Sequence, residues 1–226
     1  MRLDERLSMC AKFVRPGSRL ADVGTDHAYL PIWLVQNSVV THVIATDLRD
    51  GPLLNARQNI VKYKADGHIE TRLSDGFDAV AVDEADDFVL AGMGGELIIK
   101  IVARAAWLKD EKKHLILQPM SAEKELREFL ACEGFALADE QAVTCSGKVY
   151  TVMSVFFRGE AVSTNALYPY IGKLGENLSV ANQLYIKREI RDLKNKQKGY
   201  IATAQEKNAR STQCIIEELE RLIGGE

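Results

Sequence analysis

A short turn rich in acidic residues follows the first apolar segment of the chain. The turn is residues 22–27, of sequence DVGTDH, and Asp47 ends the next apolar segment, residues 43–46. A strand that stops at a glycine lets the backbone approach a ligand closely, and an acid about two dozen residues later can accept hydrogen bonds from ribose hydroxyls. Together the two features predict a site for a nucleotide-type cofactor.

The same turn discriminates between cofactors. The dinucleotide pattern G-x-G-x-x-G needs further glycines, whereas Thr25 and Asp26 stand where a pyrophosphate would press. The acidic charge disfavours a pyrophosphate but tolerates a ligand with cationic centres, such as the sulfonium and ammonium of S-adenosylmethionine. The alternative is a purely structural turn in which Asp26 is the N-cap of the next helix. The turn alone leaves both interpretations open.

Length and composition limit the number of domains and the class of protein that the chain can form. A chain of 226 residues that is 46% hydrophobic has room for one α/β domain and an appendage. The charged N-terminus and the lack of a long apolar stretch predict a cytoplasmic protein that does not enter a membrane. Four cysteines without C-x-x-C spacing predict neither a metal site nor a disulfide framework. A net charge of −3 means that any binding to a polyanion must come from a local basic patch.

Strand-like and helix-like segments alternate through the first part of the chain. After a leading helix over 3–14, which Pro16-Gly17 closes, we predict strands at 19–23, 43–46, 69–73, 87–91 and 114–117. Helices are predicted between them at 29–36, 52–63 and 96–107, and at 122–132 with Ser121 as N-cap. Two further strands, 135–145 and 149–157, have no helix between them and predict an antiparallel pair. A doubly wound α/β sheet with an antiparallel final hairpin is the Rossmann-like layout of class I methyltransferases.

The last part of the chain is predicted to be a separate helical unit. Residues 1–159 would form the cofactor-binding domain and residues 160–226 an appendage. Two apolar stripes, one on each side of Gly199, predict an antiparallel helical hairpin that resembles a coiled coil, and a single long helix is the alternative.

Further motifs lie where the predicted strands end. Asp75-Gly76 follows the third strand, where a methyltransferase holds the adenine of its cofactor, and residues 91–95, of sequence AGMGG, follow the fourth. Enzymes that methylate exocyclic amines commonly carry a Pro-Pro-aromatic motif at this second place. This chain lacks the motif, so an exocyclic nitrogen is a less suitable acceptor.

Taken in order, these motifs resemble the S-adenosylmethionine-dependent bacterial tRNA (adenine-22-N1) methyltransferases. The resemblance rests on residues 20–31, 50–52, 75–76, 91–95 and 115–119, and on 147–150 in the final hairpin. It implies methyl transfer to N1 of an adenine in the D-arm region of tRNA. Where relatives can have Glu at the end of the second strand, this chain has Asp47, which serves equally for ribose.

The site residues follow from the motifs and the resemblance together. Asp26, Tyr29 and Met93 are assigned to the reaction cleft: Asp26 to accept from the adenine N6 amine, and Tyr29 to stack on the base. The predicted cofactor-binding residues are Asp22, Gly24, Asp26, His27, Asp47, Leu48, Asp75, Gly76, Ala91 and Gly92. The predicted substrate-binding residues are Arg6, Asn59 and a basic stripe of Lys187, Arg188, Arg191, Lys194, Lys196 and Lys198.

Two other functions stay open on the sequence alone. The cofactor turn would also suit a methyltransferase acting on a small molecule or a protein, and the helical hairpin would suit a non-catalytic RNA-binding protein. The basic stripe can equally be a solvated helix face. In the favoured interpretation the protein is a metal-free monomer that binds tRNA.

Overall fold

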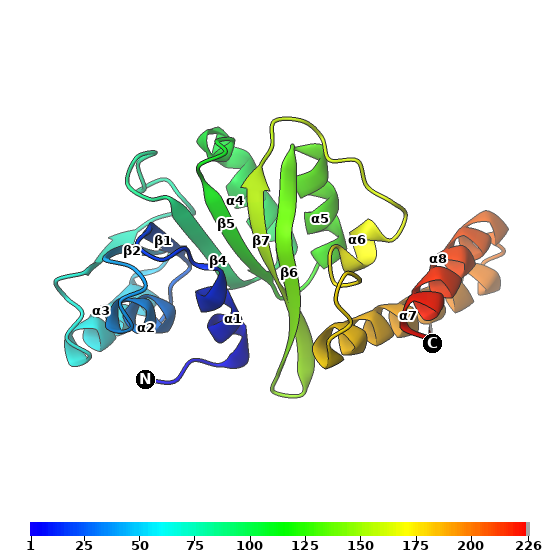
Figure 1. The fold of residues 1–226 in the computed structure, drawn as a ribbon, viewed down its shortest axis with the longest axis horizontal. Coiled ribbons are helices and arrows are strands. Elements are labelled where there is room, and N and C mark those ends of the chain that lie inside the picture. The colour runs from blue at the N-terminus through cyan, green and yellow to red at the C-terminus, as the bar shows by residue number, and fades with distance from the viewer. Residues whose placement is uncertain (225–226) are drawn as a thin grey trace.

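A seven-stranded sheet forms the centre of the computed structural model, which describes residues 1–224 (Figure 1). Its strand order is β3-β2-β1-β4-β5-β7-β6; the five strands from β3 to β5 are parallel, and β7 runs antiparallel to both β5 and β6. The strands are β1 Arg19–Val23, β2 His42–Asp47, β3 Ile69–Leu73, β4 Asp87–Met93, β5 His114–Pro119, β6 Phe135–Cys145 and β7 Lys148–Phe157. The predicted parallel sheet with an antiparallel final hairpin is confirmed.

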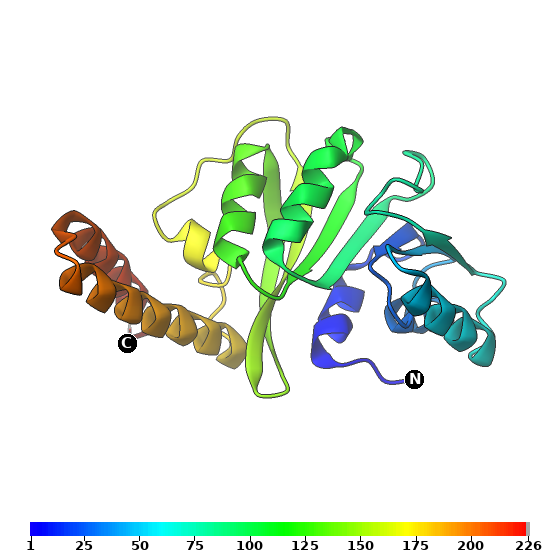
Figure 2. The ribbon, with the colours of Figure 1, turned by 180° about the vertical axis from the view of Figure 1, so that it is seen from behind.

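Helices cover both faces of the sheet because the central strands are apolar on both sides. These helices are α1 Glu5–Phe13, α2 Tyr29–Gln36, α3 Asp50–Lys62, α4 Gly95–Arg104 and α5 Glu123–Cys132, with a 3₁₀ turn at Ala106–Leu108. Leu20, Val89 and Ile116 pack with α1, α2 and α3 on one face, and their neighbours Ala21, Phe88 and Leu115 pack with α4 and α5 on the other. Figure 2 shows the face covered by α4 and α5.

Two local predictions about helices are wrong. Ser121 does not cap α5: the N-cap residue is Ala122, which is left-handed (φ 56°) and makes no side-chain cap bond. Gly199 does not separate the C-terminal helices, because α7 (Val180–Ala202) continues through it and α8 is Glu206–Gly224. The segment before α7 contains a further short helix, α6, Tyr168–Ile171.

The predicted helical hairpin is confirmed, and its base is fastened to the sheet. Helices α7 and α8 project from the β6 side of the molecule (Figure 1). Near the start of α7 the buried Asn182 accepts a hydrogen bond from the Ala142 amide of β6 (2.8 Å). Arg127 of α5 reaches Glu140 of β6 and donates to the Tyr185 hydroxyl of α7. The hairpin base is therefore held by buried polar contacts as well as by apolar packing.

Residues 1–224 contain neither a candidate membrane span nor a disulfide. No helix there combines the length and the apolar character needed to cross a membrane. The four cysteines are free thiols, Cys10 and Cys145 buried and Cys132 and Cys214 exposed.

Candidate functional site

The conformation of the acidic turn between β1 and α2 is set by left-handed residues and by backbone hydrogen bonds to β2. Gly24 has φ +77°, and the amides of Gly24 and Thr25 both donate to the Thr46 carbonyl of β2 at 2.8 Å. Asp26 also has a left-handed backbone (φ 46°), and its side chain is 62% exposed. Helix α2 has Ala28 as its N-cap residue, without a side-chain cap bond. Asp26 is therefore not a helix cap, and its carboxylate is available to a ligand.

The cavity beside this turn measures about 500 Å³, which is within the range of about 300–1,000 Å³ typical of small-molecule sites. We call it the cofactor cavity. It brings together eight of the predicted site residues: Arg6, Asp22, Gly24, Asp26, His27, Tyr29, Ala91 and Gly92. Its wall also includes Asp4, Leu7, Thr25, Leu30 and Met120, which were not among the predicted site residues. The ends of β1 and β4 thus converge on one site, as parallel strands require.

The other predicted residues lie outside this wall. Asp47 is buried at the end of β2, where its Oδ1 accepts from the Arg49 amide (3.0 Å), and Leu48 beside it is exposed. Asp75 and Gly76 line a separate hollow of about 210 Å³, where Asp75 pairs with Arg104 at 2.8 Å. The structure thus places the predicted adenine contact apart from the cofactor cavity.

Two predicted contact residues support the turn instead of lining the cavity. The end of the Met93 side chain lies so close to Gly24 that a Cβ there would be 2.9 Å from Met93 Cε. The Asn59 amide nitrogen donates to the His27 carbonyl at 3.0 Å. Met93 therefore packs against the glycine of the turn, and Asn59 ties α3 to it.

The chemistry of the cofactor cavity fits a cationic ligand. Burial raises the pKa of Asp22 to about 6, and the nearby charge of Asp47 raises it as well. A Cβ added to Gly92 would meet only Arg6 Nη1, at 3.9 Å, so the backbone there is open to a ligand. A buried carboxylate with a raised pKa is stabilised as an anion when a cation binds beside it. The site therefore fits the ammonium and sulfonium of S-adenosylmethionine.

Cofactor affinity is expected to fall as Asp22 becomes protonated. If only the ionised form binds, a pKa of about 6 makes binding about tenfold weaker at pH 5 than at pH 7. In the free protein the sign is opposite: the raised pKa stabilises the fold at low pH, and this contribution is lost as the pH rises through about 6. Calorimetry of S-adenosylmethionine binding from pH 5 to 7 measures the first effect. The Asp22→Asn variant should bind weakly at every pH, and an unchanged pH slope in that variant would remove Asp22 from the explanation.

Aromatic and acidic side chains meet at the exposed part of the turn. The rings of His27 and Tyr29 are stacked, with centroids 5.2 Å apart, and His27 Nε2 lies 3.6 Å from Asp26 Oδ2. Tyr29 is 40% exposed, so part of its ring faces solvent. A flat ring beside a carboxylate can receive a planar base and accept a hydrogen bond from its amine.

A second cavity adjoins the first, and we call it the hairpin cavity. Its volume is about 750 Å³, and Met120 belongs to the walls of both cavities. Its other lining residues come from α7 and the β6–β7 hairpin: Leu184, Lys187, Arg188 and Arg191, and Thr144, Gly147, Lys148, Val149 and Tyr150. The predicted basic stripe thus contributes one wall of a cavity next to the cofactor cavity.

Arg6 of α1 connects the two cavities. Its guanidinium donates to the side chains of Gln118 (3.2 Å) and Asp4 (2.7 Å) and lies over the Tyr150 ring, 5.6 Å from the centroid. Gln118 is fully buried, and its Oε1 also accepts from the Gly92 amide (3.1 Å). Gln118 therefore positions both Arg6 and the backbone at Gly92. Its place in the segment 115–119 was the only sequence signal for this role.

The basic stripe lies on α7 as predicted, but its six cations differ in their partners. Arg188 donates to the Val149 carbonyl, pairs with Glu123 and Glu189, and stacks on Tyr185 at 4.2 Å. Lys194 pairs with Glu220 of α8 at 2.6 Å, and Arg191 pairs with its exposed neighbour Asp192. Among residues 1–224, the cations of this stripe without an ion pair are Lys187, Lys196 and Lys198. The charges of these three lysines are therefore not offset by an ion pair among the described residues.

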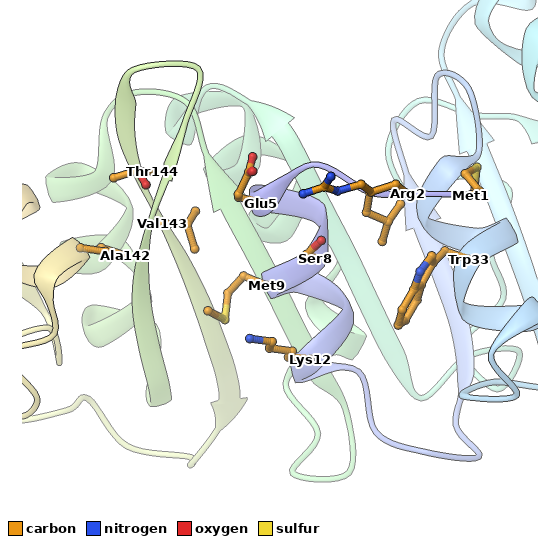
Figure 3. A pocket seen from close by; sticks show the side chains of 12 residues that line it. Met1, Arg2, Glu5, Ser8, Met9, Lys12, Trp33, Ala142, Val143 and Thr144 are labelled. Atoms are coloured by element: carbon orange, nitrogen blue, oxygen red, sulfur yellow. The ribbon is translucent and has the colours of Figure 1, made fainter.

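A third hollow, of about 510 Å³, lies on the solvent side of α1 (Figure 3). Trp33 and Arg2 lie on one side of the helix, and Val143 and Thr144 of β6 lie on the other. None of the predicted site residues lines this hollow. The described part of the chain also contains no group of three or more His, Cys, Asp or Glu side chains that could hold a metal ion.

Comparison with known proteins decides the family. The family described as "Methyltransferase domain" matches residues 3–153. The Bacillus subtilis protein named tRNA (adenine(22)-N(1))-methyltransferase is 31% identical over 227 residues, which cover 97% of this chain and 93% of that protein. This chain belongs to the tRNA (adenine(22)-N(1))-methyltransferase family. It is therefore a methyltransferase, as the resemblance of its motifs predicts.

Solved structures of this methyltransferase family share the whole architecture. The crystal structure of the Bacillus subtilis m1A22 tRNA methyltransferase superimposes with a TM-score of 0.83 at 30% identity, covering 99% of this chain and 98% of the other. A Streptococcus pneumoniae relative, solved in complex with S-adenosyl-L-methionine, has a TM-score of 0.83 at 28% identity and covers 95% and 100% of the two chains. The match therefore includes the helical hairpin as well as the methyltransferase domain.

Proposed function

We propose that this methyltransferase transfers the methyl group of S-adenosylmethionine to N1 of adenine 22 in tRNA. The observation that carries the proposal is the pair of adjoining cavities with opposite charge. The cofactor cavity is lined by Asp4, Asp22 and Asp26 and by one arginine, Arg6, whereas the hairpin cavity is lined by Lys148, Lys187, Arg188 and Arg191 and by no acidic residue. A cationic cofactor and an anionic RNA strand can therefore bind side by side.

The proposed reaction needs alignment more than acid–base catalysis. Adenine N1 has a free lone pair at neutral pH, so no residue has to remove a proton before it attacks. S-adenosylmethionine, when bound, supplies an electrophilic methyl group. Tyr29 stacks on the target base and fixes its plane. Asp26 accepts a hydrogen bond from the N6 amine and stabilises the positive charge that develops on the ring.

The turn and the strand ends hold this arrangement in place. Asp22 and the open backbone at Gly24, Ala91 and Gly92 bind the cofactor, with His27 packed against Tyr29. Asp47, Leu48, Asp75 and Gly76 remain proposed cofactor contacts that require the ligand to extend beyond the cavity wall. Met93 and Asn59 act through the turn that they support. Arg6 stays a proposed substrate contact.

We assign residues 1–159 to methyl transfer and residues 160–226 to tRNA binding. The three lysines of α7 without an ion pair support this division. Because the proposed substrate is tRNA, we also propose that the protein is a cytoplasmic, metal-free monomer. Deleting residues 160–226 would not test the division cleanly. It would also remove Tyr185 and the Pro169 and Tyr170 carbonyls, which accept hydrogen bonds from the buried Arg127. Point variants on α7 are the better probe.

Removing one unpaired lysine should weaken tRNA binding and its dependence on salt. For Lys187→Ala we expect the slope of log affinity against log salt concentration to decrease by about 1, because one phosphate contact is lost. Lys194→Ala, on the same helix but paired with Glu220, is the matched variant and should change the slope less. Equal slopes for the wild type and Lys187→Ala would show that α7 is a solvated face at this position.

The proposed substrate class is tested by supplying methyl-labelled S-adenosylmethionine with two acceptors, an unmodified tRNA transcript and a cell extract freed of RNA. We expect label in the tRNA alone. Label confined to protein or small molecules in the extract would overturn the proposal in favour of a different acceptor. Cofactor binding without transfer to either acceptor would favour a non-catalytic RNA-binding protein.

A further inference from the structure

The hairpin cavity is placed where a nucleotide next to the target base must lie. It shares Met120 with the cofactor cavity, and Arg6, which lines the cofactor cavity, lies over the ring of Tyr150, which lines the hairpin cavity. Consecutive nucleotides are joined by a single phosphate. When one base enters the cofactor cavity, a neighbouring nucleotide therefore has to occupy an adjoining space.

The surface of the hairpin cavity has the two components that bind single-stranded RNA. Its apolar part consists of Val149, the exposed Leu184 and the half-buried ring of Tyr150, over which the Arg6 guanidinium also lies. Its charged part includes Lys148 and Lys187, which have no ion pair within residues 1–224. An aromatic face for a base, with cations nearby for phosphates, is the usual combination for an unpaired strand.

The wall between these components is cross-linked by Arg188. Arg188 is fixed by the Val149 carbonyl (3.1 Å) and by Glu123 (2.9 Å), so it joins α7 to β7 and α5. The cavity is therefore formed before a ligand arrives, and its volume of about 750 Å³ is within the range of sites for nucleotide-sized ligands. Arg188 shapes the cavity, while Lys148 and Lys187 remain available to the ligand.

We propose that the hairpin cavity binds the unstacked nucleotide adjacent to the target adenine, with its base against Tyr150 and its phosphate near Lys148 and Lys187. This inference rests on the proposed function, since it needs a tRNA substrate. It adds Tyr150 and Lys148 to the substrate-binding residues. It also explains how an extruded adenine is held: its neighbour replaces stacking within the RNA by stacking on the protein.

A double-mutant cycle tests the contact between the base and Tyr150. One change is Tyr150→Ala, and the other is an abasic nucleotide at position 21 or 23 of the tRNA; the readouts are tRNA Kd and the KM for tRNA. Loss of one stacked base is expected to weaken binding by about tenfold. At the flanking position that occupies the cavity, Tyr150→Ala and the abasic site should each give this loss, and the two together should give little more.

Controls separate stacking from damage to the fold. Tyr150→Phe keeps the ring and should rescue the affinity lost in Tyr150→Ala, whereas cofactor affinity should be alike in both variants. Lys148→Ala should decrease the salt dependence of binding, and Lys112→Ala, an exposed lysine at the opposite end of the strands, should not. Losses that multiply at both flanking positions would overturn the inference while leaving the proposed function intact. Failure of the wild type to methylate the tRNA would instead be a failure of the proposed function.

Discussion

Asp26→Asn is expected to lower kcat for tRNA methylation by about 100-fold, equivalent to about 2.7 kcal/mol of transition-state stabilisation. The Asp26 carboxylate is exposed in the free protein and does not cap helix α2, so it can interact with a substrate. Positive charge on adenine appears only during attack, so the loss should fall on kcat and not on binding. Asn is the cleaner replacement because it tolerates the left-handed backbone at φ 46°, whereas Ala would add strain. Single-turnover kinetics with saturating cofactor and tRNA measure the effect.

The matched control is Asp66→Asn, which removes an exposed carboxylate from the loop before β3, at the other end of the sheet. It should leave kcat unchanged. Cofactor affinity and tRNA Kd of the Asp26 variant should stay within a few-fold of the wild type. Wild-type kcat in Asp26→Asn would exclude Asp26 from the mechanism, and a raised KM with normal kcat would reassign it to binding.

Glu140→Ala is expected to lower the free energy of unfolding by about 3–5 kcal/mol, because it leaves Arg127 as a buried charge without its partner. Both side chains of this ion pair are fully buried, and Arg127 Nη2 lies 2.7 Å from Glu140 Oε1. Glu140 also accepts from the Thr151 hydroxyl (2.7 Å) and the Lys173 amide (3.0 Å). Since these bonds join α5, β6, β7 and the segment leading to α7, we also expect the hairpin to become less firmly docked. Urea denaturation measures the loss of stability.

Glu133→Ala provides the comparison. Glu133 forms an ion pair of similar length with Lys109 (2.8 Å), but both side chains are 42% exposed, so its loss should cost less than about 1 kcal/mol. Replacing Arg127 and Glu140 together with apolar residues should restore part of the stability lost in Glu140→Ala. A Glu140 variant no less stable than the Glu133 variant would show that the buried pair does not hold the junction.

The cofactor turn and the alternation of strands and helices could be predicted because their signals are local. An apolar segment that ends in a glycine turn, repeated with intervening helices, dictates a parallel sheet whose strand ends meet at one edge. Asp22, Gly24 and Gly92 converge on the cofactor cavity for that reason. The hairpin at residues 145–148 could also be predicted, since no helix fits between its strands.

Features that depend on tertiary contacts could not be predicted. Ala28 and Ala122 begin helices in a left-handed conformation that no propensity favours. Arg127 and Glu140 read as surface charges on a helix and a strand, yet they form the buried junction with α7. Arg188 and Lys194 belong to an evident basic stripe, but their acidic partners Glu123 and Glu220 are distant in sequence. Sequence periodicity indicates which face of a helix or strand is polar, but it does not indicate which residues that face contacts.

Position-resolved nucleoside mass spectrometry tests the central claim most directly. Unmodified tRNA carrying A22 and a transcript with A22→G are each incubated with the protein and S-adenosylmethionine, and the digested nucleosides are separated to distinguish N1- from N6-methyladenosine. The account predicts 1-methyladenosine at position 22 of the first transcript and no methylated adenosine in the second. N6-methyladenosine, or equal methylation of both transcripts, would contradict direct attack by N1 of adenine 22.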